Sequence, residues 1–101
     1  MNQFKGNIAI LGSGNIGISL AKGLVKANYA LPGQISLTRR NISNLSSLAG
    51  QGFLTSTDNA AVVAAADIVV LAVLPQQLNQ LLDQIRPVVN PEKHLFISVA
   101  S

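Results

Sequence analysis

Short apolar runs alternate along the chain with longer stretches in which apolar side chains recur every three or four positions. The continuous apolar run at 8–11 is typical of a parallel strand buried on both faces. Further strands are predicted at 35–38, 53–55, 67–73 and 95–99. Helical spacing predicts helices at 15–28, 41–49 and 75–85, and another that Thr57 or Asp58 caps and that runs to Ala66.

This regular alternation of strands and helices predicts an α/β fold. Strands that follow one another through helices form a parallel sheet with right-handed crossovers and helices on both faces. The 101 residues suffice for a single core and are too few for two, so we expect one domain spanning 1–101. The sequence thus predicts a doubly wound parallel sheet.

A glycine turn joins the first predicted strand to the first helix. Gly12, Gly14 and Gly17 form the pattern G-x-G-x-x-G, in which the first glycine permits a tight turn and the second a close approach to phosphates. The third lets the helix pack closely on the strand, and the helix presents its unpaired N–H groups to an anion. The turn therefore predicts a Rossmann-type dinucleotide-binding domain.

The end of the second predicted strand bears on which dinucleotide is bound. A site that prefers NAD usually has an acidic residue here, about 20 residues beyond the glycines. This chain has Thr38, Arg39 and Arg40 instead. Guanidinium groups form charge-assisted bonds with a 2′-phosphate, and the Thr38 hydroxyl can add a donor. We therefore expect NADP(H) rather than NAD(H) as the cofactor.

The fourth predicted strand ends where ligands of open α/β sheets usually lie. Ala72, Val73 and Pro75 are therefore predicted to line the path from the pyrophosphate to the nicotinamide. Pro75 also suits the first turn of a helix, whatever its neighbours bind.

The remaining polar residues predict no catalytic residue and no metal ligand. Asp67 suits a structural contact at the start of a strand, and His94 suits a surface or loop position without a carboxylate partner. Asp83 and Glu92 are expected to be solvated. Neither a pair of carboxylates nor an arrangement of nucleophile and base stands out.

Composition narrows the class of partner. Only 11% of residues are charged, against about 25% in a typical soluble domain, so we expect another domain or subunit to cover apolar surface here. The net charge is +3, but the basic residues form no long run, which argues against a nucleic-acid-binding protein. The absence of cysteine suits a cytoplasmic protein. Asp67 interrupts the most apolar region, 60–74, which is too short for a membrane helix.

Five segments resemble the N-terminal half of pyrroline-5-carboxylate reductase, in order and over nearly the whole chain. They are Ile8 to Gly17, Thr38 to Asn41, Thr57 to Asn59, Ala66 to Gln76 and Ile97 to Ser101. Members of that family reduce 1-pyrroline-5-carboxylate to proline with NAD(P)H, the last step of proline biosynthesis. The resemblance implies the same activity for the protein to which this domain belongs.

The resemblance also implies roles for individual residues. The pyrophosphate would lie on Gly12, Ser13, Gly14, Asn15, Ile16 and Gly17. Thr38, Arg39, Arg40 and Asn59 would hold the adenosine end, whereas Ala72, Val73 and Pro75 would border the nicotinamide ribose. Ser98 to Ala100 would approach the nicotinamide ring.

The resembled family has a C-terminal helical domain that forms the dimer and most of the imine pocket. This chain stops before it, so we expect a truncated cofactor domain that binds NADP(H) without turnover. Leu74 stands where the family commonly has lysine. A stand-alone NADP-sensing module and the cofactor domain of a β-hydroxyacid dehydrogenase-like or deazaflavin-dependent NADP reductase remain alternatives.

Overall fold

A computed structural model describes residues 6–12, 15–38 and 49–98 of the chain. Its strands are β1 (Ile8–Leu11), β2 (Ile35–Thr38), β3 (Leu54–Ser56), β4 (Ile68–Leu71) and β5 (Leu95–Ser98). Its helices are α1 (Asn15–Lys26), α3 (Asn59–Ala64) and α4 (Pro75–Ile85), with short 3-10 turns η1 (Pro32–Gln34) and η3 (Arg86–Val88). The helix predicted at 41–49 lies outside the described residues except for Ala49.

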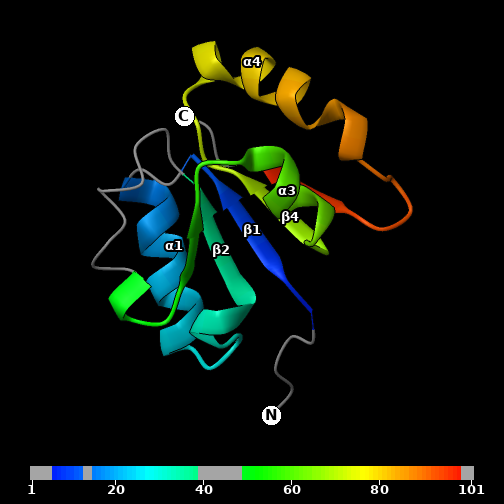
Figure 1. The fold of residues 1–101 in the computed structure, drawn as a ribbon. Helices are drawn as coiled ribbons and strands as arrows, with labels where there is room; N and C mark the ends of the chain where they lie inside the picture. Colours follow the sequence, from blue (N-terminus) through cyan, green and yellow to red (C-terminus); the bar gives the residue numbers. More distant parts are fainter. Residues whose placement is uncertain (1–5, 13–14, 39–48, 99–101) are drawn as a thin grey trace.

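The five strands form one parallel sheet in the order β3-β2-β1-β4-β5 (Figure 1). β1 lies at the centre, where Ile8 pairs with Ile35 of β2 on one side and with Ile68 of β4 on the other. All four residues of β1 are buried, which explains their unbroken apolar run. The predicted doubly wound, Rossmann-type α/β fold is confirmed.

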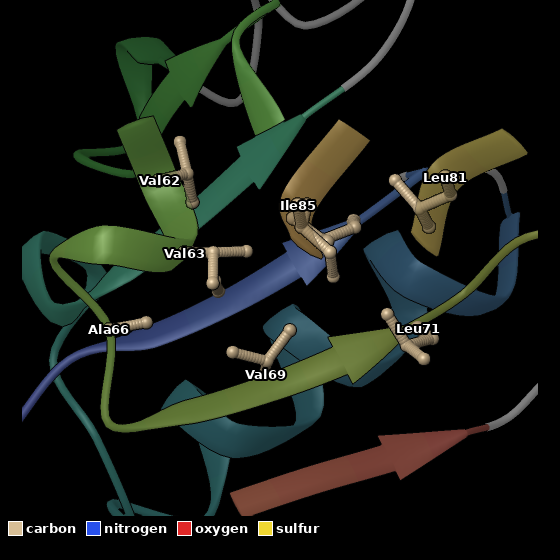
Figure 2. Close-up of a cluster of buried hydrophobic side chains, with 9 residues drawn as sticks. Val62, Val63, Ala66, Val69, Leu71, Leu81 and Ile85 are labelled. Atoms are coloured by element: carbon tan, nitrogen blue, oxygen red, sulfur yellow. The ribbon is translucent and has the colours of Figure 1, made fainter. Parts of the chain in front are cut away.

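Each face of the sheet carries its own apolar core. On one face, alternate residues of β1 and β2 pack with Ala21 and other apolar residues of α1. On the other face, Val69 and Leu71 of β4 meet α3 and α4 (Figure 2). α4 contributes Leu81 and Ile85 to this second core, so it is held over the carboxyl end of β4. The side chains that join sheet and helices there also fix the walls of the site described below.

The helix boundaries follow local hydrogen bonds. α1 ends at Lys26, two residues earlier than predicted, because the amides of Asn28 and Tyr29 donate back to the carbonyls of Val25 and Leu24. Asn28 adopts a left-handed φ of 59°, as such a helix end requires. At the start of α3, the Asp58 carboxylate accepts from the Ala61 N–H at 3.1 Å, which confirms Asp58 as the cap of this helix.

Three other boundaries differ from the prediction by a few residues. β4 spans Ile68–Leu71 rather than 67–73, because its partner β1 ends at Leu11, opposite Leu71. Asp67 precedes the strand, and its carboxylate accepts from the Asn7 N–H at 2.9 Å, which confirms a structural contact. β3 is shifted by one residue, and α3 ends at Ala64 instead of Ala66.

His94 lies in the loop before β5, which confirms the predicted loop position, but it is buried, with 7% of its surface exposed, so the predicted surface position is wrong. Its Nδ1 accepts from the Asn90 N–H at 3.0 Å, and its ring meets Phe96 edge-on with centroids 5.9 Å apart. The imidazole thus joins the start of the loop, at Asn90, to β5, at Phe96. A histidine without a carboxylate partner can still be buried when a backbone amide satisfies one nitrogen.

The α1 side of β5 leaves large apolar side chains exposed. Leu95 is 58% and Ile97 is 43% exposed, whereas Phe96, between them, packs against the core on the other face. The expectation that another domain or subunit covers apolar surface is consistent with this exposure and stays a prediction. In the part of the chain that the structure describes, no helix has the length and apolar character needed to cross a bilayer.

Candidate functional site

A cleft of about 550 Å³ opens at the carboxyl ends of the strands. Its described lining comes from the residues that follow β1 and β4, from the end of β2, from the start of α3 and from α4: Gly12, Thr38, Thr57, Asn59, Val73, Gln77, Gln80, Leu81 and Gln84. The strand order reverses between β1 and β4, so the cleft lies at the switch point where α/β sheets bind ligands.

Gly12 forms the floor of the cleft directly after β1. Its φ of +76° lies in the left-handed region, which side chains disfavour. A Cβ at this position would overlap Cγ1 of Val73 and come within 3.1 Å of the Ala72 carbonyl oxygen. Both observations require glycine here, as the sequence predicts for the first glycine of a tight turn.

A chain of hydrogen bonds crosses the cleft from β1 to α4. The Gly12 N–H donates to Oγ1 of Thr38 at 3.2 Å, and the Thr38 hydroxyl donates to Oδ1 of Asn59 at 2.6 Å. Nδ2 of Asn59 then donates to Oε1 of Gln84 at 2.8 Å. Four polar groups from four separate elements are thereby held in one arrangement.

Thr38 lines the cleft but does not offer a free hydroxyl. The residue is 1% exposed, and its hydroxyl hydrogen is committed to Asn59. The expectation that Thr38 supplies a donor to a 2′-phosphate is corrected accordingly, because a buried hydroxyl needs that internal acceptor. A contact between Thr38 and a cofactor stays a prediction.

The other predicted site residues are distributed around this cleft. Val73 and Asn59 line it, whereas Ala72 is half-buried beside Gly12 and Pro75 is the exposed first residue of α4. In α1, Gly17 is buried and Ile16 is 50% exposed. The side chain of Asn15 and all of Ser13, Gly14, Arg39 and Arg40 lie outside the described residues. Cofactor contacts of all these residues stay predictions.

Three glutamines of α4 that the sequence analysis did not single out also line the cleft. Gln77, Gln80 and Gln84 follow a spacing of three and four, which places them on one stripe of the helix beside Leu81. The same spacing in the sequence is the signal that could have revealed this polar stripe. The described lining carries no acidic side chain, so nothing described there repels an anionic ligand.

No group of three or more histidine, aspartate or glutamate side chains within the described ranges is arranged to hold a metal ion. The cleft instead offers amides, hydroxyls and a backbone turn. Such a lining suits a ligand bound through hydrogen bonds.

Comparison with known proteins places this fold and cleft in a family. Residues 7–101 match the family model described as "NADP oxidoreductase coenzyme F420-dependent". The chain belongs to this family. The match spans both the glycine turn and the strands that frame the cleft, so membership rests on the whole domain.

Curated relatives confirm the resemblance to pyrroline-5-carboxylate reductase. Pyrroline-5-carboxylate reductase 1 of Dictyostelium discoideum is 41% identical over 101 residues, all of this chain and 18% of that protein. Pyrroline-5-carboxylate reductase 2 of the same organism is 42% identical over 94 residues, 92% of this chain and 31% of that protein. The chain therefore spans less than a third of the length of these two relatives.

Solved structures agree with the fold. A pyrroline-5-carboxylate reductase from Coxiella burnetii superposes with a TM-score of 0.86 at 32% identity, covering 94% of this chain and 35% of that one. Pyrroline carboxylate reductase of Plasmodium falciparum with NADP bound gives a TM-score of 0.81 at 22% identity, over 98% of this chain and 35% of that one. At 22% identity, the similarity to the Plasmodium falciparum protein supports only the fold.

Proposed function

We propose that this chain is the NADP(H)-binding domain of a reductase that transfers hydride to the C=N bond of 1-pyrroline-5-carboxylate and so forms proline. The membership of a family of NADP oxidoreductases supports the cofactor, and the curated relatives support the substrate. The observation that carries the proposal is the cleft at the switch point, whose floor is a turn that tolerates only glycine.

The residues of the cleft fit a dinucleotide. Gly12 gives the turn its left-handed φ and lets the backbone pack against Val73, and no acidic side chain in the described lining repels a ligand with several negative charges. When bound, the nicotinamide supplies the hydride. The chain's own task is to hold and orient the cofactor: the turn after β1 for the pyrophosphate, Asn59 for the adenosine half and Val73 for the path to the nicotinamide.

A preference for NADP(H) over NAD(H) rests on the two arginines that follow Thr38 in the sequence. Calorimetric titration with NADPH and NADH tests it on the unmodified chain and on the variants Arg39→Ala and Arg40→Ala. We expect each variant to lose about 1–3 kcal/mol of NADPH binding, because a charge-assisted contact with the 2′-phosphate disappears. NADH binding stays unchanged. Equal or tighter binding of NADH by the unmodified chain would contradict the preference.

The substrate pocket and the dimer interface are assigned, as part of the proposal, to a helical region that residues 1–101 do not contain. The relatives' greater length supports this assignment. Oxidation of NADPH in the presence of 1-pyrroline-5-carboxylate, followed by absorbance, should show negligible turnover by the chain alone. Robust turnover would refute this part. A cytoplasmic location and the absence of nucleic-acid or membrane partners are also proposals.

The family's description favours one second candidate, the cofactor domain of a deazaflavin-dependent NADP reductase. The cofactor cleft would serve either enzyme, since both would transfer hydride to or from the same nicotinamide. Two assays on the full-length gene product separate them: NADPH oxidation by the cyclic imine, and NADP⁺ reduction by a reduced deazaflavin. Activity in the second assay alone would favour this candidate.

A further inference from the structure

The amide of Asn59 is held from both sides, by groups that belong to two other elements. Its oxygen accepts from the Thr38 hydroxyl at 2.6 Å, and its nitrogen donates to Oε1 of Gln84 at 2.8 Å. Asn59 opens α3, while Thr38 ends β2 and Gln84 lies in the last turn of α4. The side chain therefore bridges the sheet and α4 across the cleft.

The direction of this bridge follows from the glycine turn. The Gly12 N–H can only donate, so it takes a lone pair of the Thr38 oxygen. The buried Thr38 hydroxyl must then place its hydrogen on an acceptor, which is Oδ1 of Asn59. The Asn59 nitrogen consequently faces α4, where Gln84 meets it with an oxygen rather than its own NH2 group.

This arrangement leaves half of the Asn59 amide for a ligand. A carboxamide has two N–H donors and two oxygen lone pairs, and the bridge uses one of each. Within the described residues, one donor and one lone pair remain, which is the combination that matches a ribose hydroxyl, since a hydroxyl both donates and accepts. Asn59 lines the cleft and is half-buried, so such a ligand can reach it.

Among the side-chain hydrogen bonds of the described ranges, Asn59 to Gln84 is the one that ties α3 to α4. The two helices otherwise meet through apolar side chains such as Val63 and Leu81, which do not prescribe the orientation of an amide. A polar group that is held in its binding orientation before the ligand arrives loses less entropy on binding.

We infer that Gln84 is a positioning residue for the adenosine half of the cofactor: it acts through Asn59 and does not itself contact the nucleotide. The inference rests on the proposed binding of NADP(H). It adds to that function a residue of α4, outside every segment that carries the resemblance to the reductase family.

The test compares two variants of α4 that each replace an exposed amide with an apolar side chain of similar length. Gln84→Met removes the acceptor of Asn59, whereas Asn79→Leu, the control, changes a residue that does not line the cleft. Calorimetry with NADPH should show about three- to tenfold weaker binding for Gln84→Met, the value of one hydrogen bond, and no change for Asn79→Leu. Adenosine 2′,5′-bisphosphate, which carries only the adenosine half, should lose affinity by the same factor.

A double-mutant cycle decides whether Gln84 acts through Asn59. In an Asn59→Ala background, Gln84→Met should weaken NADPH binding no further. If Asn59→Ala does not fold by circular dichroism, Asn59→Asp serves instead, since it keeps the acceptor for Thr38 and removes the donor to Gln84.

Three results would overturn the inference. Unchanged affinity of Gln84→Met excludes any positioning role, and an equal loss in both backgrounds means that Gln84 contacts the nucleotide directly. Both results leave the proposed function intact, because the unmodified chain still binds NADPH. An unmodified chain that binds no NADPH removes the proposed function and this inference together.

Discussion

The backbone N–H of Gly12 donates to the side-chain oxygen of Thr38 over 3.2 Å, and this bond joins the carboxyl ends of β1 and β2 at the floor of the cleft. Gly12 thus has two tasks. Its missing Cβ makes room for the Val73 side chain, and its amide orients the Thr38 hydroxyl that donates to Asn59. Changes at either end of the bond should affect stability and ligand binding together.

The first prediction concerns Gly12→Ala. Alanine at this position must adopt a left-handed φ, and its Cβ overlaps the Val73 side chain. The free energy of unfolding should therefore fall by about 2–4 kcal/mol. Urea denaturation followed by circular dichroism measures this loss, and NADPH binding should weaken in parallel.

The matched control is Gly23→Ala in α1, where an added Cβ meets no atom within 4 Å. Alanine is the better helix former, so this variant should gain about 0.5–1 kcal/mol. A loss of equal size in both variants would contradict the special role of Gly12.

The second prediction concerns the buried Thr38 hydroxyl. Thr38→Val keeps the shape of the side chain but leaves the Gly12 N–H and the Asn59 oxygen without a partner. We expect a loss of about 1–3 kcal/mol in unfolding free energy, measured by urea denaturation. Thr38→Ser keeps the hydroxyl and should lose only about 1 kcal/mol for the missing methyl group. If serine is no better than valine, packing rather than the hydroxyl determines the effect.

The third prediction concerns the start of α3, which positions Asn59. Asp58→Ala removes the cap on the Ala61 N–H and should lower the unfolding free energy by about 0.5–2 kcal/mol. Asp83→Ala serves as the control, because Asp83 at the end of α4 forms an exposed ion pair with Arg86 of η3 at 3.0 Å. Such a pair contributes at most about 1 kcal/mol. A larger loss from Asp83→Ala than from Asp58→Ala would reverse the expected order.

Much of the fold is predictable from local pattern. Three elements can be recognised from a few residues of sequence. They are β1 by its apolar run, β2 by Ile35 and Leu37 on one face, and α4 by the proline at its start. The ends of β4 and α1 are less predictable, because they depend on where a partner strand stops or on a left-handed residue such as Asn28. Burial of His94 depends on a backbone amide four residues away.

The candidate site divides in the same way. The glycine turn can be recognised in the sequence because a tight turn with a left-handed φ restricts position 12 to glycine. Gln84 is not, since its importance arises only when α4 folds back over the sheet and reaches Asn59, 25 positions earlier. The hydrogen bond from the Thr38 hydroxyl to Asn59 is likewise a tertiary contact. The sequence does not reveal it and therefore predicted that this hydroxyl was available to a ligand.

The central position of β1 has a consequence for how the chain folds. β1 leaves the ribosome before either of its two neighbours in the sheet, and the later of these, β4, begins sixty positions beyond Ile8. Closing so long a loop is slow, and until it closes one edge of β1 offers unpaired backbone groups to any passing strand. During synthesis the cleft therefore takes shape only after β4 has emerged, although its glycine turn is made well before that strand.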